Sequence, residues 1–210
     1  PPRSTLFPYT TLFRSQNEKI AELESKVAVQ QKVIENLSIR TDDIESYSRR
    51  SCVRVHCIEY SSDETPENIK TIVKNRYKEM NVDYKEDAIE RVHRIGNTYK
   101  SKGKNCKSLI VKFKSWDDRV RFYQARPKRF RNGSKKPVDT PFSVSLDLTK
   151  RRYNLLKETK EAISGNSEIL YVFADINCKL ALRLKDNRII NFNSRSEIIN
   201  LIKRNDSDAI

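Results

Sequence analysis

Basic side chains are concentrated between residues 119 and 152, where Phe130 and Phe142 are interleaved with them. Guanidinium and ammonium groups neutralise phosphates and aromatic rings stack on bases, so this pattern is typical of a surface that follows a single nucleic-acid strand. A flexible, solvated linker is the alternative interpretation, and a nuclear-localisation signal is compatible with either. The eleven basic residues, set against Asp139 and Asp147, are Arg119, Arg121, Arg126, Lys128, Arg129, Arg131, Lys135, Lys136, Lys150, Arg151 and Arg152.

The whole chain carries the same bias. It has 42 Lys and Arg against 28 Asp and Glu, a formal net charge of +14 and a pI near 9.7. A charge excess of this size favours a polyanionic partner, and a solvated basic face without a partner is the alternative. No apolar run is long enough to cross a bilayer, so we expect no membrane partner.

The sequence offers little support for a catalytic site. The segment Gly133-Ser134-Lys135-Lys136 lacks the spacing of a P-loop, and no nucleophile is clearly paired with His93. The four cysteines form no Cys-x-x-Cys pair, so we expect reduced thiols and no metal site. We therefore predict a protein that is not an enzyme, with no catalytic residues, no metal and no cofactor.

A heptad pattern over residues 16–48 predicts a coiled-coil helix. Six of its eight a and d positions are apolar, Gln30 and Thr41 being the exceptions, and no Pro or Gly interrupts it. A single amphipathic helix packed on its own domain would give a similar pattern. The predicted oligomerisation residues, for a dimer or a trimer, are Ile20, Leu23, Val27, Ile34, Leu37 and Ile44.

Residues 49–136 alternate between strand and helix patterns. We expect strands over residues 52–58, 89–95 and 108–114, and helices beginning at Thr65-Pro66-Glu67 and over residues 116–125. Trp116, Val120 and Tyr123 are expected to face inward, and residues 97–107 to form a Lys-rich loop. The order βαββα, with a last strand from residues 138–145, predicts a ferredoxin-like domain similar to an RNA-recognition motif.

In such a domain the exposed face of the first and third strands binds RNA. The positions that normally carry stacking aromatics hold Arg54, Ser108 and Ile110. Period-two alternation places Arg54, His56 and Ile58 of the first strand on that face, together with Lys112 and with Arg91 or His93. This composition favours phosphate contact and Arg stacking over base reading.

Residues 137–210 predict a small α/β unit. A helix is expected over residues 148–164, short strands over residues 170–174, 180–184 and 188–192, and a capped final helix after Ser194. The predicted fold class is thus α+β, with three parts in chain order: a coiled-coil helix, an RRM-like domain and a small C-terminal RNA-binding domain.

Four motifs together resemble the first-open-reading-frame protein of LINE-type (non-LTR) retrotransposons, over roughly residues 40–205. They are Tyr47-Ser48-Arg49-Arg50-Ser51 leading into Val53-Arg54-Val55, Ile89-Glu90-Arg91-Val92-His93-Arg94-Ile95-Gly96, Ile110-Val111-Lys112-Phe113 and Leu146-Asp147-Leu148-Thr149. The resemblance implies an oligomeric single-stranded RNA-binding protein that forms a ribonucleoprotein, cytoplasmic or nuclear, with nucleic-acid chaperone activity. In that family oligomers are commonly trimers.

We predict single-stranded RNA, and also single-stranded DNA, as partners. The predicted nucleic-acid-binding residues are Arg49, Arg50, Arg54, His56, Arg91, Arg94, Lys112, Arg126, Lys128, Arg129, Arg131, Lys150, Arg151 and Arg152. The alternative is a coiled-coil protein-interaction scaffold whose positive charge is incidental.

Residues 1–15 differ in character from the rest and resemble a translated sequencing adapter. We expect them to be non-native and the natural chain to begin upstream of Gln16.

Overall fold

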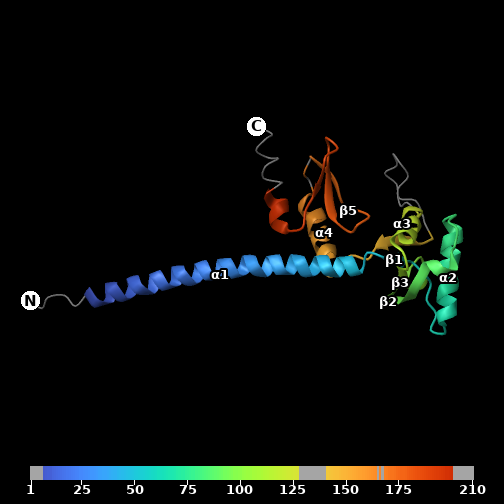
Figure 1. Cartoon of the computed structure of the whole chain (residues 1–210), viewed down its shortest axis with the longest axis horizontal. Coiled ribbons are helices and arrows are strands. Elements are labelled where there is room, and N and C mark those ends of the chain that lie inside the picture. The colour runs from blue at the N-terminus through green and yellow to red at the C-terminus, as the bar shows by residue number, and fades with distance from the viewer. Residues whose placement is uncertain (1–6, 128–140, 165, 167, 201–210) are drawn as a thin grey trace, which may run out of the picture. The chain divides into compact units, whose positions relative to one another are not determined.

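The computed structural model describes residues 7–127, 141–164, 166 and 168–200. The chain divides into two units, residues 1–44 and 45–210. It is of mixed α+β class, with a long N-terminal helix and antiparallel sheets (Figure 1).

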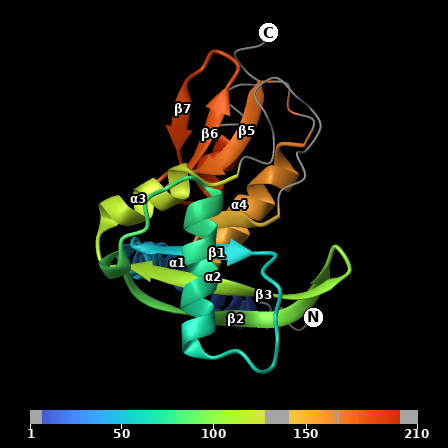
Figure 2. The same cartoon turned by 90° about the vertical axis from the view of Figure 1, so that its right-hand side faces the viewer.

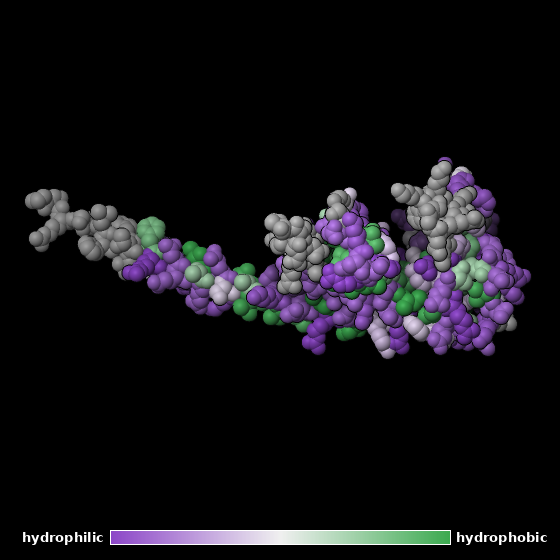
Figure 3. All heavy atoms as spheres, turned by 90° about the horizontal axis from the view of Figure 1, so that it is seen from above, coloured by the Kyte–Doolittle hydropathy of each residue, from purple (hydrophilic) through white to green (hydrophobic). Residues whose placement is uncertain are grey.

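The helix α1 spans Phe7–Ser48. It contains no glycine, and its only proline, Pro8, lies in the first turn, where the missing N–H is tolerated. The long N-terminal helix predicted from the heptad is confirmed, and it also runs through most of residues 1–15. Hydrophobic side chains lie at intervals along α1 among hydrophilic ones (Figure 3), and the six predicted seam residues are 53–73% exposed.

The first part of the second unit is a four-stranded antiparallel sheet. The strands are β1 (Cys52–His56), β2 (Ile89–Ser101), β3 (Lys104–Phe113) and β4 (Ser143–Leu146), in the order β2-β3-β1-β4. Helix α2 (Pro66–Glu79) joins β1 to β2, with a short 3₁₀ turn at Glu86–Ala88, and helix α3 (Trp116–Gln124) follows β3. Both helices contribute to one core on the same face of the sheet (Figure 2).

That core consists of inward strand residues and two helix stripes. Val53, Val55 and Val111 are fully buried, and Phe122 packs between Phe113 and Tyr77 with ring centroids 5.4 and 4.7 Å away. The helices begin where the sequence predicts them, because side-chain oxygens cap their free N–H groups. Thr65 accepts from Asn68 N, and Ser115 accepts from Asp118 N.

Three local expectations for this region are wrong. Ile58 is buried in the core and not on the opposite face, because Cys57 adopts a positive φ of 61° and ends the alternation. The expected loop over residues 97–107 is a β-hairpin, since Lys102 and Gly103, both at positive φ, form a tight turn between β2 and β3. Trp116 is 40% exposed, and Arg119 and Phe122 occupy the inward stripe of α3.

The second part contains helix α4 (Lys150–Ala162) and the strands β5 (Ile169–Ala174), β6 (Leu180–Leu184) and β7 (Ile189–Asn191), in the order β5-β6-β7. Its core holds Leu155, Val172, Leu182, Phe192 and Ile198. A last helical segment, residues 195–200, begins at Ser194, whose Oγ accepts from Glu197 N. The expected strand over residues 138–145 appears as β4, and residues 138–140 lie outside the described ones.

Phe122→Ala should remove about 3–5 kcal/mol from the free energy of unfolding, because it leaves a cavity between two aromatic rings. Urea denaturation measures this loss. Trp116→Ala is the matched control and should cost clearly less, since the tryptophan is partly exposed. A larger loss for Trp116→Ala would contradict the inward stripe described for α3.

Candidate nucleic-acid interface

The sheet face opposite α2 and α3 carries polar and basic residues. Arg54 on β1 pairs in register with Ile110 on β3 and Ser145 on β4, and Ile110 pairs with His93 on β2. Because paired residues share a face, these four side chains form one row across the sheet. Lys112 lies two residues from Ile110, opposite Arg91, and extends the face. The alternation used in the sequence prediction therefore places these residues together.

A buried carboxylate lies at one end of this face. Asp147 follows β4 and is 1% exposed. Arg54 Nε donates to Asp147 Oδ1 at 2.6 Å, and Arg49 Nη1 lies 3.4 Å from both carboxylate oxygens. Arg49 Nη2 also donates to Glu45 Oε1 at 2.6 Å. Asp147 thus fixes two arginines from segments about a hundred residues away and holds the sheet face next to the start of α4.

A pocket of about 420 Å³ lies beside this ion pair. It brings together residues from the end of α1, from β1, from β4 and from the first turn of α4. Three cationic side chains, an imidazole and a tyrosine ring line it, together with Ser145, Leu146 and Leu148. The cationic and aromatic residues are Arg49, Arg54, His56, Lys150 and Tyr153.

The first turn of α4 supplies one wall of the pocket. Thr149 Oγ1 caps the helix by accepting from Arg152 N at 3.2 Å. Lys150 and Tyr153 are three residues apart and lie on one face of the helix, both exposed, with Tyr153 at 60%. The positive end of the helix dipole favours an anion here, and the tyrosine offers a ring to a base.

His56 is fixed by hydrogen bonds at both ring nitrogens. Nδ1 lies 3.0 Å from Ser108 Oγ and Nε2 lies 2.8 Å from Ser145 Oγ. Burial lowers the pKa of His56 from its ordinary value of 6.5, and the neighbouring Arg54 charge lowers it further. The neutral imidazole therefore donates to one hydroxyl and accepts from the other, and it contributes a polar group to the pocket rather than a charge.

Arg94, predicted to contact RNA, is instead used inside the protein. It alternates with His93, so it lies on the helix-covered side of the sheet, with a side chain only 7% exposed. Its guanidinium donates to the Glu64 carboxylate and to the carbonyls of Ile58, Glu59 and Lys107. These bonds hold the segment after β1 against β3.

Arg152, also predicted to contact RNA, is 7% exposed. Its Nη1 donates to Ser46 Oγ at 2.6 Å and to the Cys178 carbonyl at 2.9 Å. It shares the inward stripe of α4 with Leu155 and Thr159, at the i, i+3 and i+7 spacing of a buried helix face. Arg152 joins α4 to the end of α1 and to the turn before β6, so it positions the pocket wall without lining the pocket.

The remaining predicted residues lie at several places. Arg50 is exposed and stacks on Tyr47 at 3.6 Å, while Arg126 stacks on Tyr123 at 3.7 Å. Lys112 Nζ donates to Glu90 at 2.6 Å across the β2–β3 pair. Arg91 is exposed, and Arg151 is half-buried in the first turn of α4. Lys128, Arg129 and Arg131 lie outside the described residues.

Neither Tyr153 nor the structural role of Asp147 was among the sequence predictions. The spacing of Tyr153 from Lys150 was a usable signal, since residues three apart share a helix face. Asp147 carried no such signal, because its arginine partners are 93 and 98 residues away.

Among the described residues, no helix is both long and apolar enough to cross a membrane. In the same part of the chain, no group of three His, Cys, Asp or Glu side chains is placed to hold a metal ion. The sequence matches no protein-family model, and no curated protein matches it either.

The lowered pKa of His56 predicts a pH-dependent stability. The native state keeps the imidazole neutral while the unfolded chain binds a proton, so the His56 contribution is complete above pH 6.5 and is lost as pH falls below it. His56→Gln, which can still bond both serines, should reduce the stability lost between about pH 7.5 and about pH 5.5 in urea denaturation. His93→Gln, on the same face, should leave that loss unchanged, and an equal effect of both variants would contradict the assignment to His56.

Proposed function

We infer that this protein binds single-stranded RNA, and single-stranded DNA as a second ligand, and that it oligomerises through α1 to form a ribonucleoprotein. The observation that carries the proposal is the pocket in which Arg49, Arg54 and Lys150 lie beside Tyr153. Proteins that bind single-stranded nucleic acid combine cationic groups, which contact the phosphates, with exposed aromatic rings, on which the bases stack.

The pocket residues divide this work by position. Lys150 projects from the positive end of α4 and suits a phosphate. The ring of Tyr153, one helical turn away, suits the face of any base. Asp147 offsets part of the arginine charge and fixes the direction of Arg54, whose side chain remains 37% exposed. Contacts of this kind carry little sequence information, so we propose binding with low sequence selectivity.

The topology supports an RRM-like interpretation of the first sheet. The order β1-α2-β2-β3-α3-β4 and the strand arrangement β2-β3-β1-β4 are those of a ferredoxin-like domain. In RNA-recognition motifs the two central strands carry stacking aromatics, whereas β1 and β3 carry Arg54, Ser108, Ile110 and Lys112 here. Because the sheet lacks these aromatics, we assign the proposed stacking of bases to Tyr153.

The apolar seam of α1 supports self-association. Its six apolar a and d residues remain exposed in the single chain, and burying them in a parallel coiled coil would remove that apolar surface from water. Linking several weak binding sites on one RNA raises the apparent affinity through effective concentration. The resemblance of the four sequence motifs to the LINE first-open-reading-frame protein points to the same assembly, a retrotransposon ribonucleoprotein with chaperone activity.

Two single variants test the division of the pocket. Lys150→Ala should reduce the slope of log affinity against log salt by about 0.7, because one phosphate contact is lost on a single strand. Tyr153→Ala should weaken binding by about 1–3 kcal/mol with the slope unchanged, because only stacking is lost. Fluorescence anisotropy with short oligo-U and oligo-dT across a salt series measures both quantities.

The matched control for this titration is Lys157→Ala, an exposed lysine on the same helix that lies two turns away and pairs with Glu161. It should behave like the unmodified protein. If neither pocket variant changes affinity or slope, the pocket is not the binding site. If the unmodified protein binds neither oligonucleotide at low salt, the scaffold alternative becomes the better account.

Leu23→Asp combined with Leu37→Asp should abolish self-association, because two charges would be buried in the proposed seam. Sedimentation equilibrium should give a dimer or trimer for the unmodified chain and a monomer for the variant. The variant should also lose affinity for a long RNA but keep it for a short oligonucleotide that fills one site. Ser25→Asp, on the polar side of the heptad, should leave the assembly intact, and a monomeric unmodified chain would refute the coiled coil.

A further inference from the structure

Strand β2 forms an open edge of the four-stranded sheet. It is the terminal strand in the order β2-β3-β1-β4, and no described strand pairs with its outer side. Residues 91–95 pair with β3 in continuous register, between two irregularities of the ladder. Alternate backbone N–H and C=O groups of this stretch therefore point away from the sheet, where another strand could pair with them.

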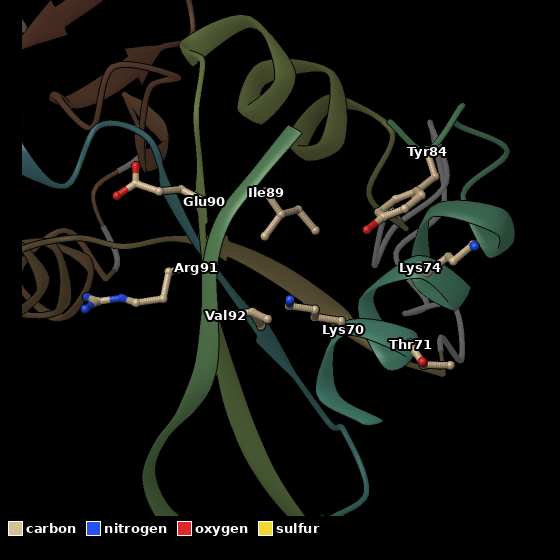
Figure 4. A pocket seen from close by; sticks show the side chains of 8 residues that line it. All are labelled: Lys70, Thr71, Lys74, Tyr84, Ile89, Glu90, Arg91 and Val92. Atoms are coloured by element: carbon tan, nitrogen blue, oxygen red, sulfur yellow. The ribbon is translucent and has the colours of Figure 1, made fainter. Parts of the chain in front are cut away.

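A second pocket, of about 250 Å³, lies between this edge and α2. Figure 4 shows Ile89 and Val92 of β2 facing the interior of the pocket, with the Lys70 amine extending from α2 towards Val92. The Tyr84 ring lies on the far side, and Lys74 Nζ is 5.6 Å from its centroid. The pocket thus has an apolar floor and cationic groups at its rim.

The charges around this edge are predominantly positive. Lys70 and Lys74 are exposed on α2, and Arg91 is exposed on the opposite side of β2, where Figure 4 shows it pointing away from α2. Among the described lining residues the acidic one is Glu90, which already forms an ion pair with Lys112 at 2.6 Å. An incoming strand would therefore meet cationic side chains on both of its faces.

We propose that the β2 edge and its pocket form a docking site for an extended acidic peptide of a partner protein, which adds to the sheet as a fifth strand. The backbone of the peptide pairs with residues 91–95, and its alternate side chains enter the pocket over Ile89 and Val92. These side chains are acidic: their methylene groups lie over Ile89 and Val92, and their carboxylates meet Lys70 and Lys74 at the rim of the pocket. This site is separate from the Asp147 pocket and shares none of its lining residues.

A polypeptide suits this site better than a nucleic-acid strand does. Only a polypeptide offers the alternating donors and acceptors that pair with an open strand edge. The described lining includes one partly exposed aromatic ring, Tyr84. Lys74 Nζ lies 5.6 Å from its centroid and the Tyr77 ring packs against it at 5.2 Å, so Tyr84 is a poorer stacking platform for a base than the exposed Tyr153.

The test uses the full 210-residue chain and a capped, fluorescein-labelled seven-residue peptide in which Glu and Val alternate. A second peptide has the same sequence with alternate amides N-methylated, so it keeps the charge but cannot pair as a strand. We expect the first peptide to bind and the second to bind at least about tenfold more weakly. Equal binding of both peptides, or no binding of the first at roughly 1 mM, would overturn the proposal.

Two charge reversals locate the peptide. Lys70→Glu should weaken peptide binding at least about tenfold by placing like charges together, while Lys160→Glu, an exposed reversal on α4, should not. Thermal unfolding checks that both variants remain folded. Oligo-U affinity should be unchanged by Lys70→Glu, and an equal loss of oligo-U and peptide binding would assign the pocket to nucleic acid and overturn the proposal.

Discussion

The buried carboxylate of Asp147 is the interaction on which the proposed site depends. A charge that is 1% exposed is stable only when it is paired, and Arg54 and Arg49 provide the pairing. These ion pairs tie the middle of β1 and the end of α1 to the segment between β4 and α4. The exposed sheet face and the N-terminus of α4 are consequently adjacent, and the pocket lies between them.

Arginine serves two distinct purposes in this protein. The side chains of Arg94, Arg119 and Arg152 are buried and each donates to at least one backbone carbonyl, so they join loops and helices to one another. Arg119 is the most extreme of them, fully buried, with Nη1 donating to the Ile176 carbonyl at 2.5 Å and Nε without a partner. Arg50, Arg54 and Arg91, by contrast, keep exposed surface. A net charge of +14 therefore overstates the charge that a polyanion would meet.

The two proposed binding sites use different parts of the same sheet. The nucleic-acid pocket lies at the β1–β4 side, where side chains from three further segments converge on an exposed face. The peptide site lies at the β2 side, where backbone groups are unpaired. Because β3 and β1 separate the two, a nucleic acid and a peptide could be bound together without competing for the same residues.

Much of the local structure followed from the sequence. The helix α1, the start of α2 at Thr65 and strands such as Leu180–Leu184 were predictable because periodicity and capping depend on residues within one turn or one strand of each other. The placement of Arg54, His56 and Lys112 on one face followed from alternation in the same way. The errors at Ile58 and at the β2–β3 hairpin arose where Cys57 and Lys102, neither of them glycine, adopt positive φ.

Local sequence patterns were thus enough to predict the class of the elements, their order and the overall basic character of the chain. Which basic residues remain exposed and which lie inside emerged in the folded chain alone, because it depends on partners distant in sequence. Arg94 lies inside because its guanidinium donates to Glu64 and three backbone carbonyls. Arg152 lies inside because it donates to Ser46 and to the Cys178 carbonyl, which are 106 and 26 residues away. A guanidinium stays in water unless the fold supplies acceptors, and no local pattern records where those acceptors will lie.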